Sequence, residues 1–243
     1  MQDPRFMSSS HAQAAEIDAG LRAYMLGVYN HMTIGMAITG FFAYFIKIMA
    51  VTSDGIITPL GMALYGSPLK WVVMLAPLGM VFWLSARVDK MKPETARNMF
   101  YAFAAVMGIS LSSILLVYTG ESVIRVFFLT AASFSALSIY GYTTKRNLTG
   151  LGSFLMMGLV GLILASIVNI FVVSSAMQFI ISVVGVLIFA GLTAYDTQQI
   201  KLMYLESDSR GVALKKSIMG ALRLYLDFIN MFIMLLSLLG NRE

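Results

Sequence analysis

The stretch that decides the fold is residues 176–200, AMQFIISVVGVLIFAGLTAYDTQQI, which contains no basic residue and a single carboxylate, Asp196. At about 1.5 Å of rise per residue, an α-helix of this length is roughly 37 Å long, enough to cross a hydrocarbon core of about 30 Å. Its apolar residues do not alternate with polar ones, as they would in a half-buried strand. The stretch is therefore predicted to be a membrane-spanning helix.

Six other stretches have the same character, and each is near the length of about 17–25 residues that a spanning helix needs. Lipid offers backbone groups no hydrogen bonds, so only helices and closed barrels cross a bilayer, and long continuous apolar runs favour helices. We predict an all-α polytopic integral membrane protein: a flexible cytoplasmic N-terminal tail (1–26) followed by a seven-transmembrane-helix bundle (27–240). The predicted helices are 27–50, 69–85, 99–118, 122–142, 151–173, 176–200 and 218–239.

The composition of the chain excludes several classes of protein. Of its 243 residues, 58% are hydrophobic and 12% are charged, whereas a soluble domain is about a quarter charged. A water-soluble enzyme, a disordered chain and a disulfide scaffold are thus excluded. Cysteine is absent and there are only two histidines, His11 and His31, which argues against a metal site built from thiolates or imidazoles.

Basic residues predict the orientation in the membrane. If the seven stretches span alternately, 13 of the 17 Lys and Arg residues fall on the side of the N-terminus. Cytoplasmic loops carry such an excess, so we expect the N-terminus in the cytoplasm and the C-terminus outside. The net charge of +5 is then explained by loops that face anionic lipid, and no nucleic-acid partner is predicted.

Only two carboxylates lie well inside the predicted spans, Asp196 in the sixth and Asp227 in the seventh. A carboxylate in hydrocarbon costs at least about 2.5 kcal/mol, so such residues usually mark pathways or proton relays. The alternative is a polar clasp that holds two helices together. Asp196 precedes Lys201 by five residues and Asp227 follows Ile218 by nine, so their depths differ by about one helical turn, which permits contact.

Polar neighbours share helix faces with the two aspartates at three- or four-residue spacing: Thr193 and Gln199 around Asp196, and Arg223 and Asn230 around Asp227. These groups offer oxygen ligands, which suit a proton or a hard cation such as Ca²⁺. They fall short of the six to eight oxygens that tight calcium binding requires, so the two aspartates are expected to bind Ca²⁺ weakly and transiently at most. Such coordination favours an ion pathway over a storage site.

If the two carboxyls meet, both cannot easily be ionised, and one shared proton would bridge the two helices. The pair is therefore a candidate pH sensor. Catalysis is not predicted: no histidine base lies in a span beyond His31, and no glycine follows Asp196 as an intramembrane aspartyl protease would require. We expect neither an enzyme nor a resident cofactor.

Two motifs resemble the Bax inhibitor-1 family: GLTAYDTQQIK at 191–201 resembles its sixth helix, and ALRLYLDFINMF at 221–232 its last. The resemblance covers all seven helices in count and order. It implies a bundle in which six helices surround the last one, and a bacterial member in the plasma (inner) membrane. It also implies a pH-sensitive calcium leak channel whose sensor pair matches Asp196 and Asp227.

Some members of that family latch the pair with an arginine at the end of the second helix, shortly after Phe-Trp. Here Phe82-Trp83 is followed by Arg87, which lies later than in that pattern, so Arg223 is a second candidate. Other members bind and restrain a membrane-bound protease, which gives an alternative function, a non-transporting regulator. The expected partners are the lipid bilayer, Ca²⁺ or protons, and in the alternative a membrane protease.

Overall fold

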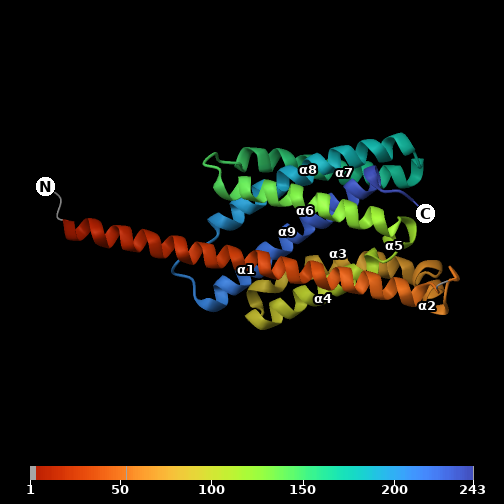
Figure 1. The fold of residues 1–243 in the computed structure, drawn as a ribbon, viewed down its shortest axis with the longest axis horizontal. Coiled ribbons are helices and arrows are strands. Elements are labelled where there is room, and N and C mark those ends of the chain that lie inside the picture. Colours follow the sequence, from red (N-terminus) through yellow and green to blue (C-terminus); the bar gives the residue numbers. More distant parts are fainter. Residues whose placement is uncertain (1–3, 53, 243) are drawn as a thin grey trace.

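The computed structural model describes residues 4–52 and 54–242, so the first three residues of the predicted tail lie outside it. The described part contains seven helices that are long and apolar enough to cross a membrane, which confirms the predicted all-α seven-helix bundle (Figure 1). The elements in chain order are α1 (Pro4–Ala50), α2 (Pro59–Gly61), a π-helical turn (Met62–Gly66), α3 (Leu69–Arg87), a 3₁₀ turn (Val88–Lys90), α4 (Pro93–Leu111), α5 (Ile114–Val117), α6 (Gly120–Thr143), α7 (Thr149–Val172), α8 (Ser175–Leu202) and α9 (Arg210–Leu239).

The N-terminal segment, which the sequence predicted to be a tail, is helical from Pro4. Helix α1 continues from there without a break to Ala50, through the predicted first span. Proline is tolerated in the first turn of a helix, and the Ala, Met, Gln and Leu residues that follow it are strong helix formers. The start of α1 consequently projects beyond the other helices (Figure 1).

The third predicted span, 99–118, is divided into α4 and the short α5. At the break, the buried Ser112 donates a hydrogen bond of 2.6 Å from its hydroxyl to the carbonyl of Ile109. The same hydroxyl lies 2.7 Å from that of Tyr65. Serine hydroxyls that bond nearby carbonyls compete with helical hydrogen bonding, which explains an interruption inside an apolar run.

Helix α9 occupies the centre of the bundle, where it packs against α1, α4, α6 and α8, whereas α3 packs on α4 and α7 on α8 (Figure 1). Among the largest fully buried side chains of the described residues are Ile218, Leu222, Tyr225, Met231 and Leu236, all of which belong to α9. A span that faced lipid would expose such residues. The central place of the last helix agrees with the arrangement that the family resemblance implied.

A glycine sets the close approach of α6 to α8. A side chain at Gly141 would collide with the backbone of Ala194, because the two helices touch at this point. In lipid, small residues of this kind let helices pack through van der Waals contact. This contact fixes the position of α8 two residues before Asp196.

The connections gather at the two ends of the bundle because successive spans are antiparallel. One end, which we call the basic end, contains the part of α1 near Arg22 together with the links 88–92, 144–148 and 203–209. Here Lys216 forms an ion pair of 2.6 Å with Asp208. The basic residues counted in the sequence therefore lie mainly at one end of the folded molecule.

Candidate functional site

The carboxyls of Asp196 and Asp227 lie within hydrogen-bond reach of each other across the contact between α8 and α9. Asp227 is 5% exposed and Asp196 is half-buried. The structure thus brings together the two aspartates that the sequence singled out. Asp196 lies six residues before the end of α8 at Leu202, whereas Asp227 lies 17 residues after the start of α9 at Arg210, just beyond the middle of that helix.

The link between the two helices explains why these carboxyls meet. Only residues 203–209 join α8 to α9, and Lys216 fixes this link by donating hydrogen bonds to the carbonyl of Met203 and the carboxylate of Asp208. Farther into the bundle, the missing side chain of Gly220 leaves room for Ile200, which is fully buried. The two helices therefore remain in contact along the turns that carry the aspartates.

One oxygen of the pair has no other partner. Asp227 Oδ2 is buried and meets no hydrogen-bond donor among the described side chains and backbone groups. A buried polar atom without a hydrogen bond is costly, and a carboxylate can only accept. A proton on either carboxyl turns that group into a donor, so a hydrogen bond between the two aspartates requires the pair to hold at least one proton.

Arg223 is the basic residue of α9 nearest to Asp227 in the sequence. It lies one helical turn before Asp227 on α9, and its side chain is exposed towards the basic end. Within the described ranges, the only ion pair is Lys216–Asp208, so Arg223 attracts the pair without a direct salt bridge. This geometry is typical of a basic side chain that extends towards the membrane surface.

Arg87, the other latch candidate, lies at the C-terminal end of α3 and is exposed. Helix α3 packs on α4, one layer away from α9. Among the described side chains, Arg87 forms no ion pair with either aspartate. The structure therefore does not bring this arginine to the pair.

The three other supporting residues do not act as a set of ligands. Thr193 is fully buried and donates to the carbonyl of Phe189 at 2.8 Å, and Asn230 donates to that of Leu226 at 2.8 Å. Both hydrogen bonds remain within their own helices. Gln199 differs, because its buried Nε2 has no acceptor among the described residues.

Two further polar residues, which the sequence analysis did not identify, share this property with Gln199. The hydroxyls of Tyr24 on α1 and Ser217 on α9 are buried and have no partner in the described part of the chain. Tyr24 lies near the charges of Asp208 and Arg223, and Ser217 Oγ would contact a side chain placed at Gly27 of α1. We call these three residues the polar zone, because each lies on the part of its helix between the level of the aspartates and the basic end. They are far apart in the sequence, so the sequence analysis did not identify them.

A hydrogen-bonded chain approaches the same part of α8 from the other side. The hydroxyls of Tyr29 and Ser138 lie 2.6 Å apart, and those of Ser138 and Thr197 lie 3.0 Å apart. Thr197 follows Asp196 directly, so this chain joins α1, α6 and α8 beside the pair. In the sequence, this chain could have been suspected only from Ser138 and Thr197, two polar residues in otherwise apolar spans.

The described residues contain no cluster of three or more His, Cys, Asp or Glu side chains. The aspartate pair supplies at most four carboxylate oxygens, fewer than the six to eight that surround a tightly bound Ca²⁺. The arrangement can share a proton and can attract a cation. It does not form an enclosed metal site.

The family described as "Inhibitor of apoptosis-promoting Bax1" matches residues 21–243. A protein of Caulobacter vibrioides is 48% identical over 231 residues, which cover 93% of this chain and 92% of the relative. The protein RP147 of Rickettsia prowazekii is 43% identical over 226 residues, 93% and 92% of the two chains. The inner membrane protein YbhL of Escherichia coli is 43% identical over 227 residues, 93% and 94% of the two chains. With seven spanning helices and this match over nearly its whole length, the chain is an integral membrane protein of the Bax inhibitor-1 family.

Proposed function

We propose that this protein is a cation leak channel, with Ca²⁺ as the permeant ion, and that the Asp196–Asp227 pair makes the leak sensitive to pH. The observation that carries the proposal is the contact between two carboxyls of neighbouring helices inside a membrane-spanning bundle. Placing an acidic side chain inside the membrane costs free energy, and such residues usually belong to an ion pathway or a proton relay. Here one of the two belongs to the central helix.

Protonation changes the contact between α8 and α9. With one shared proton, the carboxyls attract each other through a hydrogen bond; with none, two negative charges repel at short range in a poorly polarisable environment. Because α9 packs against four other helices, a shift of α8 relative to α9 alters the centre of the bundle. The pair can therefore convert a change of pH into a change of helix packing.

The polar zone at Tyr24, Gln199 and Ser217 supports a route for cations between the basic end and the aspartates. Buried polar atoms without protein partners are rare and call for an explanation, such as contact with water or an ion. The carboxylates favour cations over anions. Their small number of oxygens favours brief coordination, as a leak requires.

We further propose that the basic end faces the cytoplasm of a bacterial cell, with the protein in the inner membrane. The excess of Lys and Arg at that end follows the positive-inside rule, and the Escherichia coli relative is named an inner membrane protein. The N-terminus would then be cytoplasmic and the C-terminus outside.

Calcium flux into proteoliposomes, measured from pH 5.5 to 8.5, tests the proposed function. The wild type should show flux that changes with pH, whereas Asp196→Asn and Asp227→Asn should each remove that change. Asp89→Asn is the matched control, because it removes an exposed carboxylate at the basic end and should keep the wild-type profile. Flux that ignores pH in the wild type, or that both Asn variants leave unaltered, would overturn the proposal. Absence of flux together with a membrane protease that co-purifies and changes activity on deletion of this protein would support the regulator instead.

A further inference from the structure

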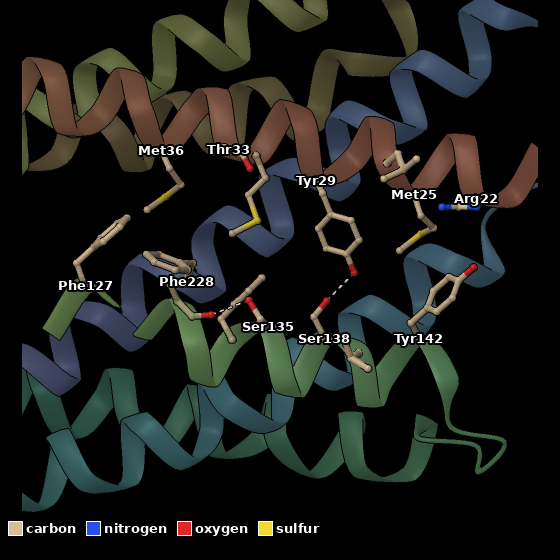
Figure 2. A pocket seen from close by; sticks show the side chains of 15 residues that line it. Arg22, Met25, Tyr29, Thr33, Met36, Phe127, Ser135, Ser138, Tyr142 and Phe228 are labelled. Atoms are coloured by element: carbon tan, nitrogen blue, oxygen red, sulfur yellow. Dashed lines mark hydrogen bonds between the residues drawn. The ribbon is translucent and has the colours of Figure 1, made fainter. Parts of the chain in front are cut away.

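A cavity of about 650 Å³ lies between α1 and α6, with Phe228 of the central helix at its floor. Side chains of the two helices point towards each other across it: Met25, Tyr29 and Met36 from α1, and Phe127 and Ser138 from α6 (Figure 2). The rim is open, since Leu26 is 52% exposed and Ile139 is 64% exposed. In a membrane, this cavity is a groove that opens sideways to lipid.

The lining of the groove suits a hydrocarbon chain. Nine of its 15 residues are apolar, and they include Met25, Met32 and Met36, whose flexible side chains adapt to irregular ligands. Along α1, the 12 residues from Met25 to Met36 rise about 16 Å, close to half of the roughly 30 Å hydrocarbon core. The apolar part of the groove therefore matches the depth of one leaflet.

The end of the groove nearer the basic end is polar and positively charged. Arg22 and Tyr142 line it together (Figure 2). Lys201 adds a second positive charge there: its ammonium donates to the carbonyl of Tyr142 at 2.8 Å and lies 4.9 Å from the centre of that ring. No lining residue is acidic. The guanidinium of Arg22 is exposed, and guanidinium groups pair well with phosphate in two parallel hydrogen bonds.

We propose that this groove binds one acyl chain of an anionic phospholipid of the leaflet at the basic end, with the lipid phosphate on Arg22. Three features coincide in it: a lateral opening, an apolar length that equals one leaflet, and cations where the headgroup would lie. The binding site is separate from the aspartate pair and does not depend on the proposed leak.

Photo-crosslinking in nanodiscs tests the lipid site. The probe is phosphatidylglycerol with a diazirine at the end of one acyl chain, and the matched probe is phosphatidylcholine with the same chain. The peptides that carry Met36 and Phe127, at the deep end of the groove, should be labelled at least fivefold more by the anionic probe. Equal labelling by the two probes would overturn the proposal, because it would show ordinary boundary lipid.

Two pairs of variants locate the site. Ala131→Phe fills the groove and should reduce the labelling at least fivefold, whereas Ala132→Phe, one residue along α6 and exposed outside the groove, should leave it unchanged. Arg22→Gln should bring the anionic probe down to the level of phosphatidylcholine, and Lys90→Gln, an exposed cation of the same end, should not. Wild-type labelling in Ala131→Phe and Arg22→Gln would contradict the assignment. Asp227→Asn should keep the lipid labelling, which separates this test from the test of the leak.

Discussion

The hydroxyls of Thr39 on α1 and Tyr225 on the central helix α9 lie 2.6 Å apart, two residues before Asp227. Both side chains are buried, and Thr39 Oγ1 also lies 3.0 Å from the carbonyl oxygen of Gly35 and 2.9 Å from that of Ala104. The Tyr225 ring packs edge-on against Phe100 and Phe103 of α4. This contact ties the helix that carries Asp227 to α1 and α4.

Tyr225→Phe should lower the free energy of unfolding by about 1 kcal/mol, because it removes one hydrogen bond and keeps the ring. Tyr225→Ala should cost about 3–5 kcal/mol, since it also leaves a cavity between three helices. Denaturation in detergent micelles, followed by circular dichroism, measures both. Tyr140→Phe, at a side chain that is 48% exposed, is the control and should behave as the wild type. Equal losses for Tyr225→Phe and Tyr225→Ala would show that the ring packing contributes little.

Asp227→Asn should abolish the pH dependence of thermal stability that the pair confers. In the wild type, a rise in pH removes the shared proton and leaves two like charges in contact, so the melting temperature should fall as the pH rises. The Asn amide can donate to Asp196 at every pH, so the melting temperature of the variant should stay nearly constant. A scanning measurement from pH 5.5 to 8.5 gives both profiles. An unchanged slope in the variant would mean that other groups set it.

Arg223→Gln should move the midpoint of the flux profile to higher pH. Arg223 lies one helical turn before Asp227 on α9, and a nearby positive charge favours ionised carboxylates, so its removal should let the pair keep a proton at higher pH. Arg87→Gln should leave the midpoint in place, because the structure keeps Arg87 away from the pair. Calcium flux in proteoliposomes measures the two midpoints. A midpoint that moves in Arg87→Gln but stays in place in Arg223→Gln would make Arg87 the latch. Helix α3 would then have to move towards the pair.

Val173→Gly should raise the melting temperature. Val173 ends α7 with a φ of 52°, and it is the only described residue other than glycine with a positive φ. A β-branched side chain in this conformation costs about 1–2 kcal/mol, of which the greater chain entropy of glycine in the unfolded state offsets part. Val172→Gly, one residue earlier inside the helix, should instead destabilise the protein by about 1 kcal/mol. A lower melting temperature for Val173→Gly would contradict the account of strain at this turn.

The sequence by itself determined the seven spans and the two unusual carboxylates. Both are local properties: the length of an apolar run decides whether a helix can cross the hydrocarbon, and the high cost of an acid in lipid makes Asp196 and Asp227 stand out. The sequence predicted the ends of the helices less well than their existence. Helix α1 extends back to Pro4, and the hydroxyl of Ser112 interrupts the third span.

Only the tertiary structure decided which groups meet. The rotation of each helix about its axis and the choice of its neighbours depend on packing between residues far apart in the chain, as where Gly141 admits Ala194. That packing brings the two carboxyls together, keeps Arg87 away from them and buries polar atoms of Tyr24, Gln199 and Ser217. It also separates α1 from α6 enough to form the groove, which no single stretch of the sequence encodes.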